Sequence, residues 1–152
     1  MPYNVLIING PNLGRLGERQ PEIYGQTGLN QLPEVLKTIM GESAQQINFS
    51  YFQSNSEGAL IDRLEQAYDQ KIDALIINAG AYTHTSLALA DCLAWIKIPY
   101  VEVHLSNTMA RPEKIRHKSF IAQNALGVIA GFGINGYALA AIALLENLRN
   151  KH

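Results

Sequence analysis

The stretch that decides the fold is Ala74-Leu75-Ile76-Ile77-Asn78-Ala79-Gly80. A short apolar run that ends in a polar residue and a glycine is typical of a strand buried on both faces of a parallel sheet. Four further runs of the same kind occupy residues 4–9, 47–53, 100–104 and 126–130, each bounded by Gly, Asn or Ser. The sequence therefore predicts five buried strands.

Helical patterns alternate with these runs. One apolar stripe comprises Leu29, Leu32, Leu36, Ile39 and Met40, and a second comprises Leu60, Leu64 and Ala67. Two more helices are predicted over 86–96 and 137–149. Strict alternation of strands and helices favours a flavodoxin-like, doubly wound α/β fold, with a five-stranded parallel sheet and helices on both faces. We expect one catalytic domain over 1–152.

Composition excludes several classes of partner. Lys and Arg number 12 against 13 Asp and Glu, so the net charge of −1 predicts neither nucleic acid nor an acidic membrane surface as a partner. The single Cys92 cannot form an internal disulfide, and no apolar run is long enough to span a bilayer. We therefore expect a cytoplasmic protein.

Polar residues follow three of the predicted strands. They form the segments Asn9-Gly10-Pro11-Asn12, residues 78–86 and residues 102–107. The carboxyl ends of parallel strands meet at one edge of the sheet, where ligands bind in open α/β folds. Turn formation accounts for Gly, Pro and Asn, but not for His84 and His104 at corresponding strand ends. We interpret this edge as a functional site.

The segment 14–25 is a long loop after the first strand and carries Arg15, Arg19 and Tyr24. Loops of this length often act as lids. A guanidinium beside a tyrosine lowers the pKa of the phenol toward the range of a general base. Tyr24 is thus a candidate base, although a packing role is the ordinary alternative for such a residue.

The glycines of segment 131–136 match the spacing of a dinucleotide-binding turn. That turn belongs to the first strand-helix unit and needs an acidic residue at the end of the next strand, whereas here the chain ends in the following helix. We explain these glycines by tight turning. A flavodoxin-like module that binds a nucleotide or flavin without catalysis remains the alternative function.

Together, five segments resemble the type II 3-dehydroquinate dehydratases. They are residues 9–13 with Arg19, Pro21, Tyr24 and Gly25, and residues 53–58, 78–86, 102–107 and 131–137. The resemblance covers nearly the whole chain in order. It implies a shikimate-pathway lyase that converts 3-dehydroquinate to 3-dehydroshikimate and water by anti elimination through an enolate, with no metal or cofactor.

The resemblance also implies residue roles. Tyr24 is the base, Arg19 lowers the pKa of Tyr24, His104 protonates the leaving hydroxyl, and Asn12 helps to stabilise the enolate through water. The residues implied to bind substrate are Asn78, His84, Asp91, Leu105, Ser106 and Arg116.

Asp91 lies in the apolar helix predicted over 86–96, where an unpartnered charge is costly, so we expect it to reach a neighbouring chain's site. The resemblance implies a dodecamer built from trimers.

The chain departs from the family pattern at Gly14, Gln20 and Met109, and is one residue longer before Arg116. Arg111 therefore competes with Arg116 for the substrate-binding role.

Overall fold

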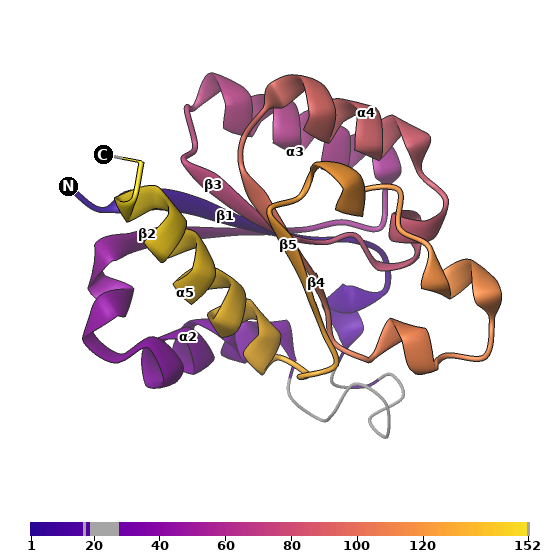
Figure 1. Cartoon of the computed structure of the whole chain (residues 1–152), viewed down its shortest axis with the longest axis horizontal. Helices are drawn as coiled ribbons and strands as arrows, with labels where there is room; N and C mark the ends of the chain where they lie inside the picture. The colour runs from indigo at the N-terminus through magenta and orange to yellow at the C-terminus, as the bar shows by residue number, and fades with distance from the viewer. Residues whose placement is uncertain (17, 19–27, 152) are drawn as a thin grey trace.

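The computed structural model describes residues 1–16, 18 and 28–151, which form one parallel sheet between two helical layers (Figure 1). The strands are β1 (Tyr3–Asn9), β2 (Ile47–Gln53), β3 (Ala74–Asn78), β4 (Tyr100–His104) and β5 (Gly127–Ala130). Their order is β2-β1-β3-β4-β5, and every neighbouring pair is parallel. The predicted doubly wound, flavodoxin-like α/β architecture is confirmed.

The long helices are α2 (Leu32–Met40), α3 (Glu57–Asp69), α4 (Leu87–Ile96) and α5 (Asn135–Arg149). Helix α2 packs against α5 on one face of the sheet, and α3 packs against α4 on the other (Figure 1). Shorter 3₁₀ helices fill the connections at Leu13–Arg15, Leu29–Gln31, Gly41–Gln46, Gly80–His84, Thr108–Ala110, Lys114–His117 and Ala122–Asn124.

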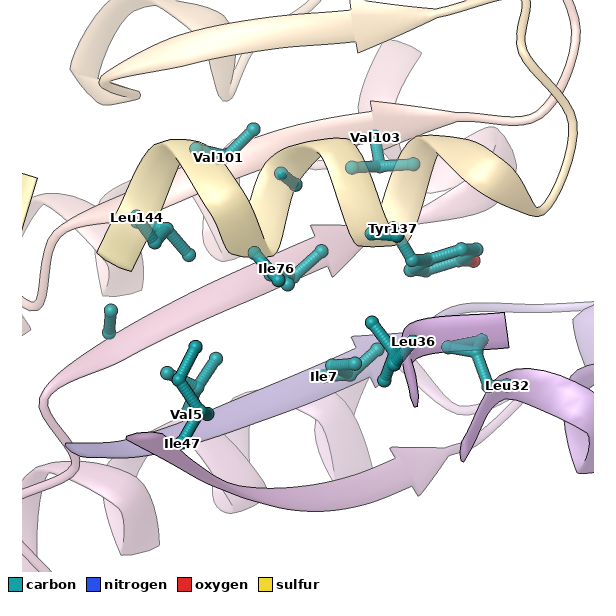
Figure 2. Packing of buried hydrophobic residues seen from close by; sticks show 14 of the residues in the cluster. Val5, Ile7, Leu32, Leu36, Ile47, Ile76, Val101, Val103, Tyr137 and Leu144 are labelled. Carbon is teal, nitrogen blue, oxygen red and sulfur yellow. The ribbon is translucent and has the colours of Figure 1, made fainter. Parts of the chain in front are cut away.

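Strand alternation divides the core into two halves. Val5, Ile7 and Ile76 face α2 and α5, as Figure 2 shows, whereas Leu6 and Ile77 face α3 and α4. Successive side chains of a strand point to opposite faces, so a strand covered on both sides must be apolar at nearly every position. This explains why β1, β3 and β4 read as short apolar runs. The prediction of five buried strands is wrong for the edge strands β2 and β5, whose residues in the single chain are mostly half-buried or exposed.

Helix boundaries follow capping chemistry. Ser56 and Ser86 precede α3 and α4, and their hydroxyls accept hydrogen bonds from the backbone N–H of Ala59 and Leu89. Helix α2 begins at Leu32 because Pro33 suits the first turn, so Leu29 falls in a preceding 3₁₀ turn rather than in the helix as predicted. Ile39, assigned to the buried stripe, is in fact exposed.

The turn between β5 and α5 needs its glycines. Gly131 and Gly133 have φ values of +99° and +59°, in the left-handed region that side chains with a Cβ rarely adopt. Tight turning therefore accounts for the dinucleotide-like spacing, as predicted. Among the described residues, no helix is both long and apolar enough to cross a membrane.

Candidate functional site

The carboxyl ends of β1, β3 and β4 lie side by side because these strands are neighbours in the sheet. Asn9 and Asn78 are register partners, and the backbone N–H of Gly10 donates to the carbonyl of Asn78 at 2.7 Å. A Cβ on Gly10 would stand 2.3 Å from the carbonyl oxygen of Ala79, so only glycine permits this approach. The sheet edge thus brings together polar segments that are far apart in the chain.

A narrow cleft of about 50 Å³ opens at this edge. Its lining includes most of the predicted site residues, namely Asn78, His84, His104, Leu105, Ser106 and Arg116. The competing candidate Arg111 also lines the cleft, with its Nη1 3.4 Å from the Ser106 hydroxyl. Arg116 lies 3.6 Å through Nε from the carboxylate of Glu113. Both arginines are therefore within the same site.

The side chain of His104 contacts the carboxylate of Glu102, which lies two residues earlier on β4. The two side chains share a face of the strand, and Nε2 of His104 contacts a carboxylate oxygen of Glu102. Glu102 is 1% exposed and its second oxygen accepts from the Ser119 hydroxyl at 2.7 Å. Since the carboxylate is an acceptor, Nε2 carries a proton, and Nδ1 is the nitrogen left to exchange a proton with a ligand.

Ser119 can only donate to Glu102. Its oxygen already accepts the backbone N–H groups of Ile121 and Ala122 at 3.2 and 3.1 Å. The hydroxyl proton is then directed to Glu102, which receives one donor on each oxygen.

His84 lies beside His104 with the rings nearly parallel, their centroids 6.1 Å apart and their planes inclined by 19°. Nδ1 of His84 is 2.6 Å from the backbone carbonyl of Lys118, which can only accept, so Nδ1 is protonated. In the neutral ring Nε2 then offers a lone pair, which suits the binding of a hydroxyl group.

Asn12 lines a neighbouring cleft of about 760 Å³ rather than the narrow one. It has a φ of 68°, and its backbone N–H donates to Oδ1 of Asn55 at 3.0 Å. Gln53, at the end of β2, donates to the Gly10 carbonyl at 3.0 Å. The two clefts are lined by successive residues, Asn12 and Leu13, of the segment after β1.

Asp91 lines neither of these two clefts. It lies on the outer face of α4 with Leu87 and Trp95, which are 64% and 49% exposed. Asp91 is exposed on this face of the single chain, and its contact with a neighbouring chain's site stays a prediction.

Arg19 and Tyr24, the predicted lid arginine and base, lie outside the described residues. Among the residues that the structure does describe, no group of three or more His, Cys, Asp or Glu side chains is arranged to hold a metal ion.

Glu102 and Ser119 were not among the predicted site residues. The signal for Glu102 was present, since a carboxylate two residues before His104 in a strand must share its face, and a charge buried in an apolar strand needs a partner. Ser119 gave no comparable signal, because it reaches Glu102 across a separation of 17 residues.

Comparisons with known proteins agree on one family. The model of "Dehydroquinase class II" matches residues 3–145. A 3-dehydroquinate dehydratase of Synechococcus sp. (strain CC9605) is 52% identical over 96% of this chain and 97% of its own length. One from Prochlorococcus marinus (strain MIT 9211) is 50% identical over 97% of both chains.

A solved structure gives the same result. The type II dehydroquinase of Butyrivibrio crossotus DSM 2876 superposes with a TM-score of 0.87 at 39% identity, covering 95% of this chain and 98% of the other. These matches favour the enzyme family over the alternative of a nucleotide- or flavin-binding module. The chain belongs to the class II dehydroquinase family, as its sequence motifs had indicated.

Proposed function

We propose that this protein is a 3-dehydroquinate dehydratase, a carbon-oxygen hydro-lyase that converts 3-dehydroquinate to 3-dehydroshikimate and water. The convergence of His84, His104 and Asn78 on one cleft, in a chain of the class II dehydroquinase family, carries the proposal. The relatives named as 3-dehydroquinate dehydratases match this chain over nearly its full length.

The reaction proceeds by anti elimination through an enolate. A base removes the proton beside the ketone, and the enolate then expels the hydroxyl as it is protonated. Tyr24 is the base, Arg19 lowers the pKa of Tyr24, and Asn12 stabilises the enolate oxygen through a water molecule. The exposed position of Asn12 in the larger cleft supports a contact through water.

His104 is the acid that protonates the departing hydroxyl. Its contact with Glu102 supports this role, because a buried carboxylate fixes the ring and leaves Nδ1 to deliver the proton. Asn78, with the backbone of Leu105 and Ser106, holds the substrate carboxylate. His84 and Arg116 bind the ring hydroxyls, with Arg111 as the competing arginine.

The protein assembles as a dodecamer built from trimers, in which Asp91 reaches a neighbouring active site. Exposed Leu87 and Trp95 on either side of Asp91 support a subunit contact over this face of α4. It works in the cytoplasm, where the buried thiol of Cys92 stays reduced. Mixed oligomers of Asp91→Asn and His104→Gln chains should regain activity, whereas a monomeric mass would contradict the assembly.

The elimination is tested by the rise in near-ultraviolet absorbance as the conjugated product forms. Activity should survive EDTA and borohydride and collapse in Tyr24→Phe, while Tyr3→Phe, at the opposite end of β1, retains it. Substrate deuterated stereospecifically beside the ketone should lose the label that is anti to the hydroxyl. An inert wild-type protein would exclude the proposed function, and an active Tyr24→Phe variant would exclude Tyr24 as the base.

A further inference from the structure

Tyr137 lies beneath the site in the first turns of α5 and is completely buried. Figure 2 shows its ring beside the strand that carries Ile76. Its hydroxyl accepts a hydrogen bond from Nδ2 of Asn78 at 3.1 Å and donates one to Oδ1 of Asn9. Asn9 and Asn78 are 4% and 3% exposed and are register partners on β1 and β3. The Tyr137 hydroxyl therefore links the carboxyl ends of β1 and β3 to helix α5.

The directions of these hydrogen bonds are determined by the backbone. The N–H of Gly80 points to Oδ1 of Asn78 at 3.2 Å, and a backbone N–H can only donate. The carbonyl oxygen of Asn78 must therefore face Gly80, and the NH₂ group must face Tyr137. The Tyr137 hydroxyl accepts this bond and turns its own proton toward Asn9.

One N–H bond of the Asn78 side-chain amide points to Tyr137, and the side-chain oxygen faces the N–H of Gly80. Within the described part of the chain, no residue accepts the second N–H bond. Asn78 lines the narrow cleft, so its remaining N–H bond is available there as a donor to a ligand, while its side-chain oxygen is directed toward Gly80. Burial raises the pKa of Tyr137 above its ordinary value near 10, against a smaller lowering by Asn78, so the hydroxyl keeps its proton under assay conditions.

We infer that Tyr137 is a positioning residue for ligand recognition, which holds Asn78 so that an N–H bond faces the cleft. The site then selects an acceptor at this point of the ligand, such as a carboxylate oxygen, and disfavours a donor. The inference rests on the proposed function, in which Asn78 holds the carboxylate of 3-dehydroquinate. Tyr137 itself acts only through Asn78.

Tyr137→Phe tests this inference because it removes the hydroxyl and keeps the ring. We expect KM for 3-dehydroquinate to rise about tenfold while kcat stays within about twofold, since Asn78 binds substrate and transition state alike. Tyr100→Phe is the matched control, because Tyr100 is also fully buried and its hydroxyl also donates one bond, to the carbonyl of Ile121. It should lower the melting temperature similarly and leave KM unchanged.

A wild-type KM in Tyr137→Phe would overturn the inference, as would an equal rise of KM in both variants, which would indicate a general effect of lost stability. A second measurement does not depend on activity. The side-chain amide protons of Asn78, assigned in NMR spectra by their loss in Asn78→Asp, should exchange with water at least about tenfold faster in Tyr137→Phe.

Failure of the proposed function can be told apart from failure of the positioning role of Tyr137. If the wild-type protein does not dehydrate 3-dehydroquinate, the proposed function fails, and the exchange of the Asn78 amide still decides whether Tyr137 positions it. Unchanged exchange in Tyr137→Phe would overturn the positioning role whatever the substrate.

Discussion

Replacing Glu102 by Gln should impair catalysis because two donors converge on this carboxylate. His104 contacts one of its oxygens through Nε2, and the Ser119 hydroxyl donates to the other. Ser119 cannot reverse its bond, because its oxygen already accepts two backbone N–H groups. A glutamine has one acceptor oxygen, so it can satisfy Ser119 or His104 but not both.

The size of the effect follows from the burial of the pair. If the oxygen of the introduced glutamine faces Ser119, its NH₂ group meets the N–H of His104, and the protonated ring loses its partner. A hydrogen bond to a charged group contributes about 1.5–3 kcal/mol, and Glu102 is 1% exposed, so water cannot replace it. We expect kcat/KM for 3-dehydroquinate to fall roughly 10- to 150-fold, mainly through kcat, because the acid acts in the transition state.

A double-mutant cycle with Ser119→Ala tests this reasoning sharply. Without the Ser119 hydroxyl, the oxygen of the introduced glutamine is available to turn toward His104. Glu102→Gln/Ser119→Ala should therefore be about three- to tenfold more active than Glu102→Gln alone, although Ser119→Ala alone loses activity. The absorbance assay measures the rates, and thermal unfolding establishes that each variant is folded. Activities of the double variant that merely multiply the two single losses would refute the argument.

Two further predictions concern a buried thiol in α4 and a close backbone contact at the site. The pKa of the Cys92 thiol is raised to about 11, first by burial and then by the charge of Glu65, so the thiolate is scarce at neutral pH. In the folded protein, the Cys92 thiol should resist thiol reagents at pH 8 and become more reactive as the pH approaches 11. It should react fully when the protein is unfolded. Rapid labelling of the folded protein at pH 8 would contradict this prediction. Gly10→Ala should lower the free energy of unfolding in urea by about 2 kcal/mol and abolish activity, because the Cβ would overlap the backbone carbonyl of Ala79. Gly127→Ala, with no atom within 4 Å of the added carbon, should change it by less than about 0.5 kcal/mol, and similar losses in both variants would rule out the overlap as the cause.

The strands were predictable to within one residue at each boundary, and the central strands β1, β3 and β4 gave the clearest pattern because they are covered on both faces. Burial leaves few positions for a polar side chain inside these strands, so the Asn or His that follows the apolar run marks the sheet edge. The short 3₁₀ helices were not predicted, since a single turn lacks the repeating apolar stripe that marks longer helices. Ile39 was misassigned because helical spacing alone does not say how wide the covered face is.

Site residues at strand ends were predictable for the same topological reason. His84, His104 and Asn78 line one cleft because β3 and β4 are neighbours and their carboxyl ends point the same way. Residues that act through another side chain were missed. Tyr137 reads as an apolar core residue of α5, and its contact with Asn9 spans 128 residues of sequence.

The missed partners nevertheless leave a trace in the pattern of burial. A polar side chain inside a strand covered on both faces must find a hydrogen-bond partner, so Asn9, Asn78 and Glu102 each imply one from their place in an apolar run. Strand order then narrows the search. Because β1 and β3 are adjacent and in register, Asn9 and Asn78 point to the same face, and the partner is expected from one of the two helices that cover it, α2 and α5. Tyr137 of α5 is the one buried side chain with a hydroxyl in these two helices. A polar residue in a buried strand, together with the strand order, therefore indicates which helix supplies its hydrogen-bond partner. On this basis the hydrogen bonds of Tyr137 with Asn9 and Asn78 could be anticipated from the sequence.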